Sequence, residues 1–211
     1  RSRIVSILLS LLLVISIAPG QSYGAAADGV ATTIRLASLE GSVLVENAAG
    51  KEITAKADMK LYEGYKVTTS QKSYALINLD DSKVVKVDAN SKIEVGQAGK
   101  KLEVRLIGGQ IFFNVTKKLG DDETFTIKTS NMTTGVRGTS GTVGYNGAKE
   151  ITALTLLTGK LEVQLIEPIN APEGAAPGDP QAGQRFIVEA GQRAEVHSAP
   201  PTAEGGQTPG Q

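Results

Sequence analysis

The chain has 211 residues, with 22 basic residues, 22 acidic residues, a single His and no Cys. This length allows one domain with appendages, and the lack of Cys excludes disulfides, Cys-ligated zinc and iron–sulfur clusters. Apolar residues make up 40% of the chain, but five Tyr and four Phe are its only aromatic residues besides the His. A core of Val, Ile, Leu and Ala is therefore expected, and this composition favours strands.

The first 27 residues have the pattern of a secretory signal peptide. Arg1 and Arg3 precede an uncharged, mostly apolar stretch from Ile4 to Ile17. This stretch is shorter than the roughly 20 residues that span a bilayer. We therefore expect a cleaved signal helix at 1–27, with an uncleaved membrane anchor as the alternative. The expected location is secreted or extracytoplasmic, in a periplasm or at the cell surface.

The charge balance after export excludes one class of partner. Removal of Arg1 and Arg3 lowers the 22 basic residues to 20, against 22 acidic residues, and gives a net charge of −2. The charges are scattered and form no basic block that could neutralise several phosphates, so no nucleic-acid partner is expected. Membrane contact is expected only through the signal segment.

The body of the chain, from Ile34 to Leu165, consists of short alternating runs without a sustained helical period. The clearest runs are Leu102–Leu106, Ile111–Val115 and Leu161–Leu165. Each presents one apolar face and one mostly polar face, as strands covered on one side do. The pattern predicts an all-β domain at 34–165 made of two packed antiparallel β-layers, either a sandwich or a flattened β-solenoid.

A glycine leads four of the strand-like runs. These glycines are Gly41, Gly109, Gly159 and Gly191. We interpret each as a turn residue with positive φ that feeds the following strand. Three further segments have turn composition and predict hairpins, namely Asp80–Ser82, Asp88–Ser91 and Gly96–Gly99.

The C-terminal part divides into three segments. Residues 166–184 form a Pro- and Gly-rich loop, and residues 198–211 have the composition of a disordered tail. Strand character resumes between them, so residues 185–197 are predicted to be a returning β-hairpin of the same domain.

The most distinctive segment is Val136, Arg137, Gly138 and Thr139. Together with Asp80–Ser82, Gly109–Val115, Phe125–Thr129 and the strand from Leu156 to Val163, it resembles the FecR domain over roughly Leu61 to Val163. The family pattern has Gly, Pro and Phe where this chain has Asp81, Ser130 and Gly141. Sigma-regulator members place a cytoplasmic helical region and a membrane span ahead of this domain, where this chain has an export signal. The resemblance therefore implies the domain and not sigma-factor regulation.

Arg137 is the residue of this motif that calls for a role. If it is buried among Val136 and Gly138, its guanidinium needs carboxylate or carbonyl acceptors. We interpret it as a structural residue that ties neighbouring strands together through a buried pair. A ligand-binding role is the alternative.

No constellation for catalysis is found in the sequence. The only His, His197, lies at the edge of the predicted tail, and no nucleophile, base and oxyanion donor occur together. We expect a protein that is not an enzyme and has no cofactor or metal. Phe112 points away from the core side of Phe113, so Phe112 and Tyr145 are candidates for a partner surface. The expected function is protein interaction or signal sensing at the cell envelope, and the alternative is a cell-wall or polysaccharide-binding module.

Overall fold

The computed structural model describes residues 32–166 and 183–198. All of their regular structure is β, as predicted, and no described residue is helical. The predicted signal peptide at 1–27 lies outside the described residues, as do most of the loop at 166–184 and all of the tail at 198–211 except Ser198. In chain order the strands are β1 (Arg35–Glu40), β2 (Val43–Glu46), β3 (Glu52–Thr54), β4 (Met59–Lys60), β5 (Lys66–Thr69), β6 (Tyr74–Asn78), β7 (Lys83–Val87), β8 (Ser91–Ala98), β9 (Lys101–Val115), β10 (Thr124–Lys128), β11 (Met132–Gly135), β12 (Ser140–Asn146), β13 (Ile151–Thr158), β14 (Lys160–Leu165), β15 (Arg185–Glu189) and β16 (Arg193–His197).

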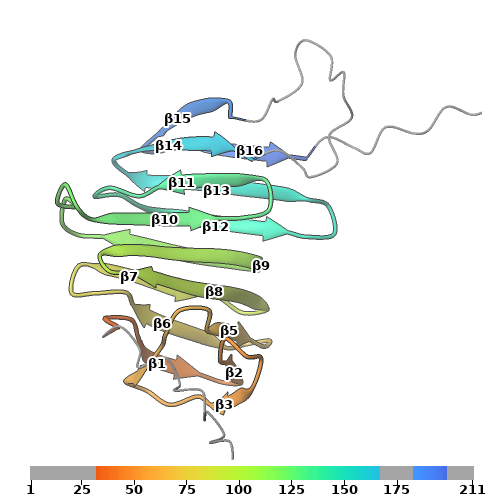
Figure 1. Cartoon of the computed structure of the whole chain (residues 1–211). Helices are drawn as coiled ribbons and strands as arrows, with labels where there is room; N and C mark the ends of the chain where they lie inside the picture. Colours follow the sequence, from red (N-terminus) through yellow and green to blue (C-terminus); the bar gives the residue numbers. More distant parts are fainter. Residues whose placement is uncertain (1–31, 167–182, 199–211) are drawn as a thin grey trace, which may run out of the picture.

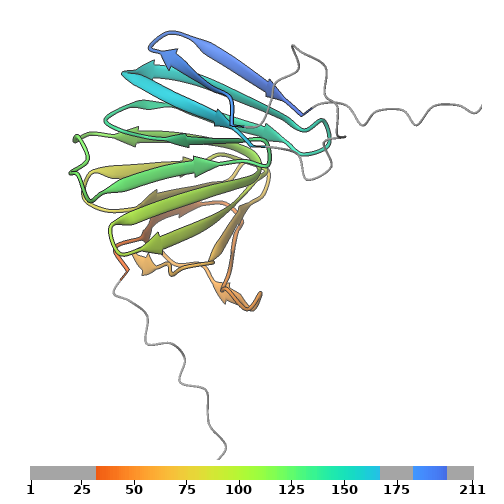
Figure 2. The ribbon, with the colours of Figure 1, turned by 45° about the horizontal axis from the view of Figure 1, so that its top comes forward.

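The strands form two layers that share β9 (Figures 1 and 2). Sheet A has the order β4-β1-β6-β7-β9-β12-β13-β16. Sheet B has the order β3-β2-β5-β8-β9-β10-β11-β14-β15. The chain passes back and forth between the two sheets and adds strands in one direction, from the red N-terminal strands to the blue C-terminal strands in Figure 1.

The prediction of purely antiparallel layers is wrong at one pair, because β10 runs parallel to β9 in sheet B. The first half of β9 pairs with β8 in sheet B, and its second half pairs with β7 and β12 in sheet A. The last residues of β9 therefore lie at the same end of the sandwich as its first residues. The following loop returns the chain to sheet B beside Lys101, which pairs with Thr124, so β10 has to run in the same direction as the first half of β9.

The turn of β9 from one sheet into the other depends on Gly109. Its φ is 87°, in the left-handed region, and a Cβ there would collide with Ser91. The next residue, Gln110, donates its backbone N–H to the Ser91 hydroxyl at 2.9 Å. The absence of a side chain thus lets two consecutive crossings of the chain pack directly on each other.

The other leading glycines mark crossings of the same kind. Gly41, Gly159 and Gly191 have φ values of 75°, 82° and 82°, which confirms the predicted positive φ. They connect β1 to β2, β13 to β14 and β15 to β16, and in each case the chain changes sheet. The recurrence in the sequence is therefore the signature of the corners of the sandwich.

The predicted hairpins are confirmed at two of three positions. Asp80–Ser82 connects β6 to β7, and Gly99-Lys100 connects β8 to β9. Asp88–Asn90 is instead a corner, because β7 lies in sheet A and β8 in sheet B. The predicted returning hairpin at 185–197 also needs correction. Both of its strands exist, but β15 pairs with β14 and β16 pairs with β13, so each extends a different sheet.

The inward faces of both sheets form a single core. It is mainly aliphatic, as the composition predicts, and Phe113 and Phe125 are its fully buried aromatic residues. One buried polar network joins the two layers. Asn131 donates through Nδ2 to the carbonyls of Glu150 at 2.8 Å and Val196 at 3.1 Å, and its Oδ1 accepts from Thr152 at 2.6 Å. Because these partners lie on or beside β13 and β16, the network holds the turn between β10 and β11 against sheet A.

The crossing of β9 generates a stability prediction. We expect Gly109→Ala to lower the free energy of unfolding by about 2–4 kcal/mol, because the new Cβ adds left-handed backbone strain to a clash with Ser91. Gly108→Ala is the matched control, since a Cβ at this neighbouring glycine meets no atom within 4 Å. Urea unfolding of both variants measures the difference. Equal midpoints for the two variants would contradict the proposed role of Gly109.

Candidate functional site

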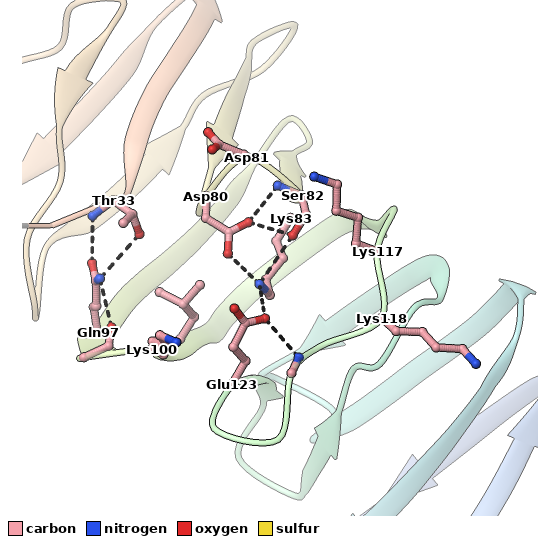
Figure 3. A pocket seen from close by; sticks show the side chains of 13 residues that line it. Thr33, Asp80, Asp81, Ser82, Lys83, Gln97, Lys100, Lys117, Lys118 and Glu123 are labelled. Carbon is pink, nitrogen blue, oxygen red and sulfur yellow. Dashed lines mark hydrogen bonds and ion pairs between the residues drawn. The ribbon is translucent and has the colours of Figure 1, made fainter.

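Four connections meet at one end of the sandwich. They are the turns between β6 and β7 and between β8 and β9, the loop from β9 to β10, and the corner from β11 to β12. Two of the segments that carry the family resemblance, Asp80–Ser82 and Val136–Thr139, belong to these connections. We call this end of the domain the motif end. A hollow of about 440 Å³ opens there and is lined by Thr33, Asp80, Asp81, Ser82, Lys83, Gln97, Gly99, Lys100, Leu102, Lys117, Lys118, Gly120 and Glu123 (Figure 3).

A buried lysine lies at the base of the hollow. Lys83 is the first residue of β7, and its side chain is 2% exposed. Its ammonium group pairs with Asp80 Oδ2 at 2.5 Å and with Glu123 Oε2 at 3.6 Å (Figure 3). A buried charge is tolerated only when it is paired, and here two carboxylates from different connections supply the pairing. The ammonium therefore fastens the loop from β9 to β10 onto the turn between β6 and β7.

Asp80 also organises its own turn. Its Oδ1 accepts from the backbone N–H of Ser82 at 2.8 Å and from the Ser82 hydroxyl at 3.0 Å. Burial by itself raises the pKa of Asp80, but the hydrogen bonds from Lys83 and Ser82 and the charge of Lys83 outweigh it and hold this pKa below its ordinary value. Asp80 is thus ionised and fully engaged, and it is not available as a general base.

The structure separates the four motif residues by role. Val136 and Thr139 are each 1% exposed and belong to the packed interior. Gly138 turns the chain with a φ of 68°. Backbone hydrogen bonds connect Val136 to Phe125 at 2.8 Å and Val115 to Thr139 at 3.0 Å. The motif is therefore a corner that joins β9, β10 and β12.

The interpretation of Arg137 as a buried structural residue is wrong. Its side chain is 66% exposed, and its partners are the carbonyl of Leu119 at 3.5 Å and the carboxylate of Asp121 at 3.9 Å. Both contacts are long, and Asp121 is itself fully exposed. Just beyond the end of β11, Val136 is buried and Arg137 is exposed, so the guanidinium lies on the surface beside the loop from β9 to β10.

The rim of the motif end carries charges of both signs. Lys100 pairs with Asp122 at 2.7 Å, and Lys117, Lys118 and Asp81 are exposed. Within residues 32–166 and 183–198 there is no cluster of three or more His, Asp or Glu that could hold a metal ion. The buried ammonium is neutralised and the outer charges are exposed. Such an arrangement suits electrostatic recognition of a partner.

The two aromatic residues predicted for a partner surface do not lie together. Phe112 is half-buried on the outer face of sheet A, opposite Lys86 and Thr142, whereas Phe113 points into the core. Tyr145 has the opposite orientation and packs against the rim of the core. Its hydroxyl accepts a hydrogen bond from the Ser130 hydroxyl at 2.6 Å.

One departure from the family pattern has a local structural explanation. A Cβ at Gly141 would collide with the Thr155 carbonyl oxygen and would lie 3.1 Å from the Phe113 ring. Gly141 and Phe113 are cross-strand partners on β12 and β9. The ring of Phe113 therefore occupies space beside position 141, which has no side chain of its own.

Sequence reasoning missed Lys83 and Glu123 as members of the site. A signal for Lys83 was present, because Lys83, Val85 and Val87 share the core-facing parity of one alternating strand. A lysine at such a position requires a carboxylate partner. One partner, Asp80, lies three positions before Lys83 in the turn that precedes β7. The other partner, Glu123, is 40 positions away along the chain, and only folding brings it close to Lys83.

The described residues thus form a two-layered β-domain whose connections gather charged groups at one end. Comparison with protein families is more specific. Residues 65–162 match the family described as FecR protein, in agreement with the resemblance found in the sequence. The match begins just before β5 and ends within β14, so β1 to β4, β15 and β16 extend the same two sheets beyond it.

The comparison with curated proteins finds no match in sequence. Among solved structures, two crystal structures of a protein from Parabacteroides distasonis ATCC 8503, described as a putative anti-sigma factor, are similar at 19% sequence identity and a TM-score of 0.45. The likeness covers 63% of this chain and 59% of that protein. In the part of the chain that the structure describes, no helix is long and apolar enough to cross a bilayer.

The ion pair of Asp80 predicts acid sensitivity. A carboxylate whose pKa is lowered by folding stabilises the protein fully above its unfolded value, here 3.8, and this contribution is lost as the pH falls through the folded value. We therefore expect Asp80→Asn to lower the urea midpoint at about pH 7 and to flatten its fall below about pH 4.

Asp81→Asn serves as the matched control, because Asp81 is exposed at the tip of the same turn. Urea midpoints of the wild type and both variants, measured from about pH 7 to about pH 3, give the comparison. If Asp80→Asn and the wild type lose stability in parallel throughout this interval, the ion pair does not contribute as described.

Proposed function

We propose that this protein is an exported, non-catalytic FecR-domain protein that recognises a protein partner at the cell envelope through its motif end. The proposal places the domain outside the cytoplasm because the first 27 residues have the pattern of a signal peptide. A regulatory or sensing role agrees with the FecR match over residues 65–162.

The exposed position of Arg137 is the observation that carries this proposal. It is the outward member of a corner whose neighbours Val136 and Thr139 are each 1% exposed, so a backbone anchored in the core presents a largely exposed guanidinium. The long contacts to Leu119 and Asp121 contribute little to stability, since exposed ion pairs are worth roughly 0–1 kcal/mol. An arginine that is fixed in place and weakly paired is a typical anchor for a carboxylate of a binding partner.

The surrounding charges favour a protein over a uniform polyanion. Lys117 and Lys118 lie on the rim with Arg137, but Asp81 and Asp121 lie there as well. A rim that carries both positive and negative charges is complementary to a partner surface that also carries both. Repulsion between like charges would disfavour binding of other proteins and so add selectivity. The electrostatic pattern is therefore that of specific protein recognition.

A glycan-binding role is less well supported. Phe112 and Tyr145 point to different sides of sheet A, so they form no common stacking platform. The ring centroids of Tyr62 and Tyr65 lie 5.5 Å apart with an interplanar angle of 61°, so these two rings present no parallel stacking faces. Polysaccharide retention is kept as the alternative outcome of the binding test.

We expect Arg137→Glu to abolish capture of the partner while changing the free energy of unfolding by less than about 1 kcal/mol. The measurement is affinity capture from an envelope extract, with bound protein and polysaccharide analysed separately, alongside urea unfolding. Arg193→Glu is the matched control, because Arg193 is 62% exposed, has one ion-pair partner and lies on β16, which β13 separates from β12 and its corner.

Two results would contradict the proposal. One is a captured protein that both variants bind equally well. The other is retention of purified polysaccharide with no protein recovered, which would favour the glycan-binding alternative.

A further inference from the structure

The last strand of sheet B lies beyond the edge of sheet A. Counted from the shared strand β9, sheet B continues through β10, β11, β14 and β15, whereas sheet A continues only through β12, β13 and β16. β15 therefore forms the top of the stack in Figure 1. Among the described residues it pairs with β14 on one side and with no strand on the other.

The register defines which backbone groups of β15 face outward. Leu165 donates to the carbonyl of Gln184 at 2.9 Å, and Ala190 donates to the carbonyl of Gly159 at 3.0 Å. Even-numbered residues of β15 thus bond to β14. Because hydrogen bonding alternates along an antiparallel strand, the backbone groups of Arg185, Ile187 and Glu189 point toward the open edge.

The side chains of the same three residues are exposed on the outer face. Ile187 is 64% exposed, the highest value among the large apolar side chains of the described residues. Natural edge strands are usually kept short or carry a charge at the position that would pair. The outer edge strands at the other end of the stack, β3 and β4, have three and two residues. β15 has five residues and an isoleucine at its centre.

We propose that β15 pairs antiparallel with β15 of a second copy of this chain, around a two-fold axis at Ile187. In this register Ile187 lies opposite its own copy, and Arg185 lies opposite Glu189 of the second copy at both ends. The outward backbone groups of all three residues then face one another as hydrogen-bonded pairs. Charge complementarity selects this register over one shifted by two residues, in which Arg185 would lie opposite Ile187.

The strand next to β15 continues the charge pattern. Arg185 pairs with Glu162 at 3.0 Å, and Glu189 pairs with Lys160 at 2.6 Å. In the dimer Arg185 would lie between Glu162 and the second copy's Glu189, so positive and negative groups would alternate across the junction. Opposite charges facing each other across neighbouring strands are stabilising, and like charges are destabilising.

The edge of sheet A lacks this complementarity. β16 is centred on Glu195, with Arg193 and His197 on either side, so self-pairing about its centre would place two glutamates opposite each other. Because sheet B extends one strand further, β15 can join its copy without requiring β16 to do so.

One contact within the chain competes with the proposed pairing. Gln192 accepts from the backbone N–H of Glu189 through Oε1 at 2.8 Å and donates its own N–H to the Glu189 carbonyl at 3.0 Å. In the dimer, the backbone N–H of Glu189 would donate to the carbonyl of Arg185 of the second copy and no longer to the side chain of Gln192. The N–H and C=O of Ile187 have no such competitor among the described residues.

Sedimentation velocity of the purified full chain over a range of concentrations tests the inference, and a monomer–dimer equilibrium is expected. Arg185→Glu gives an edge with two acidic residues, and Glu189→Arg gives an edge with two basic residues. Each variant alone should form dimers roughly tenfold or more weakly, because the two-fold axis repeats every like-charge contact twice. An equimolar mixture of the two variants should restore dimers, since each acidic edge then faces a basic one.

Ile187→Lys should also weaken the dimer. Ile107→Lys is its matched control, because Ile107 is 39% exposed and lies on β9, which β10, β11 and β14 separate from β15. Circular dichroism of each variant checks the fold.

Amide hydrogen exchange at Ile187 gives a second readout that needs no variant, with protection expected to rise with protein concentration. A wild type that stays monomeric at about millimolar concentration, a dimer that survives the charge variants, or Ile187 protection independent of concentration overturns the inference. The last result would mean that another part of the same chain covers the edge.

Discussion

The close packing of Gly109 on Ser91 is the constraint on which the architecture depends. It lets one long strand, β9, serve in both sheets, so each layer is built outward from the same strand. The crossing also reverses the direction of the chain, which explains why the loop after Val115 returns to Lys101 and why β10 is parallel. A side chain at position 109 would force the two crossings apart and separate the layers at their common strand.

The same topology assembles the motif end. Once β9 has returned, the loop from β9 to β10 lies against the turn between β6 and β7, and Glu123 reaches Lys83. The buried ammonium is neutralised by two carboxylates from different connections. Its role is therefore to hold these connections together at the base of the hollow. The exposed charges of Arg137, Lys117 and Lys118 are thereby presented on connections that the core and the ion pairs hold in place.

The outer face of sheet B carries ion pairs on strands at both ends of the stack. Lys92 pairs with Glu46, Lys128 pairs with Glu103, and Arg185 pairs with Glu162. Each is at least partly exposed to solvent and contributes little energy alone. Together they cover a broad β surface with alternating charge and leave apolar exposure concentrated at a few positions, of which Ile187 lies on an edge strand. Charge patterning and strand order thus jointly determine which part of the surface is suited to association.

The sequence by itself determined the all-β class, the aliphatic core, the corner glycines and the FecR resemblance, because alternation, composition and positive-φ glycines are local properties of the chain. Only the tertiary structure decided that β9 belongs to both sheets, that β10 is parallel, and that β15 and β16 extend different layers, since strand pairing depends on contacts between distant segments. It also decided the roles of the charged residues. Lys83 and Glu123 lie 40 positions apart, and Arg137 is exposed because its corner leaves the guanidinium outside the core. Burial is a property of packed neighbours, and no local pattern specifies which neighbours a side chain will have.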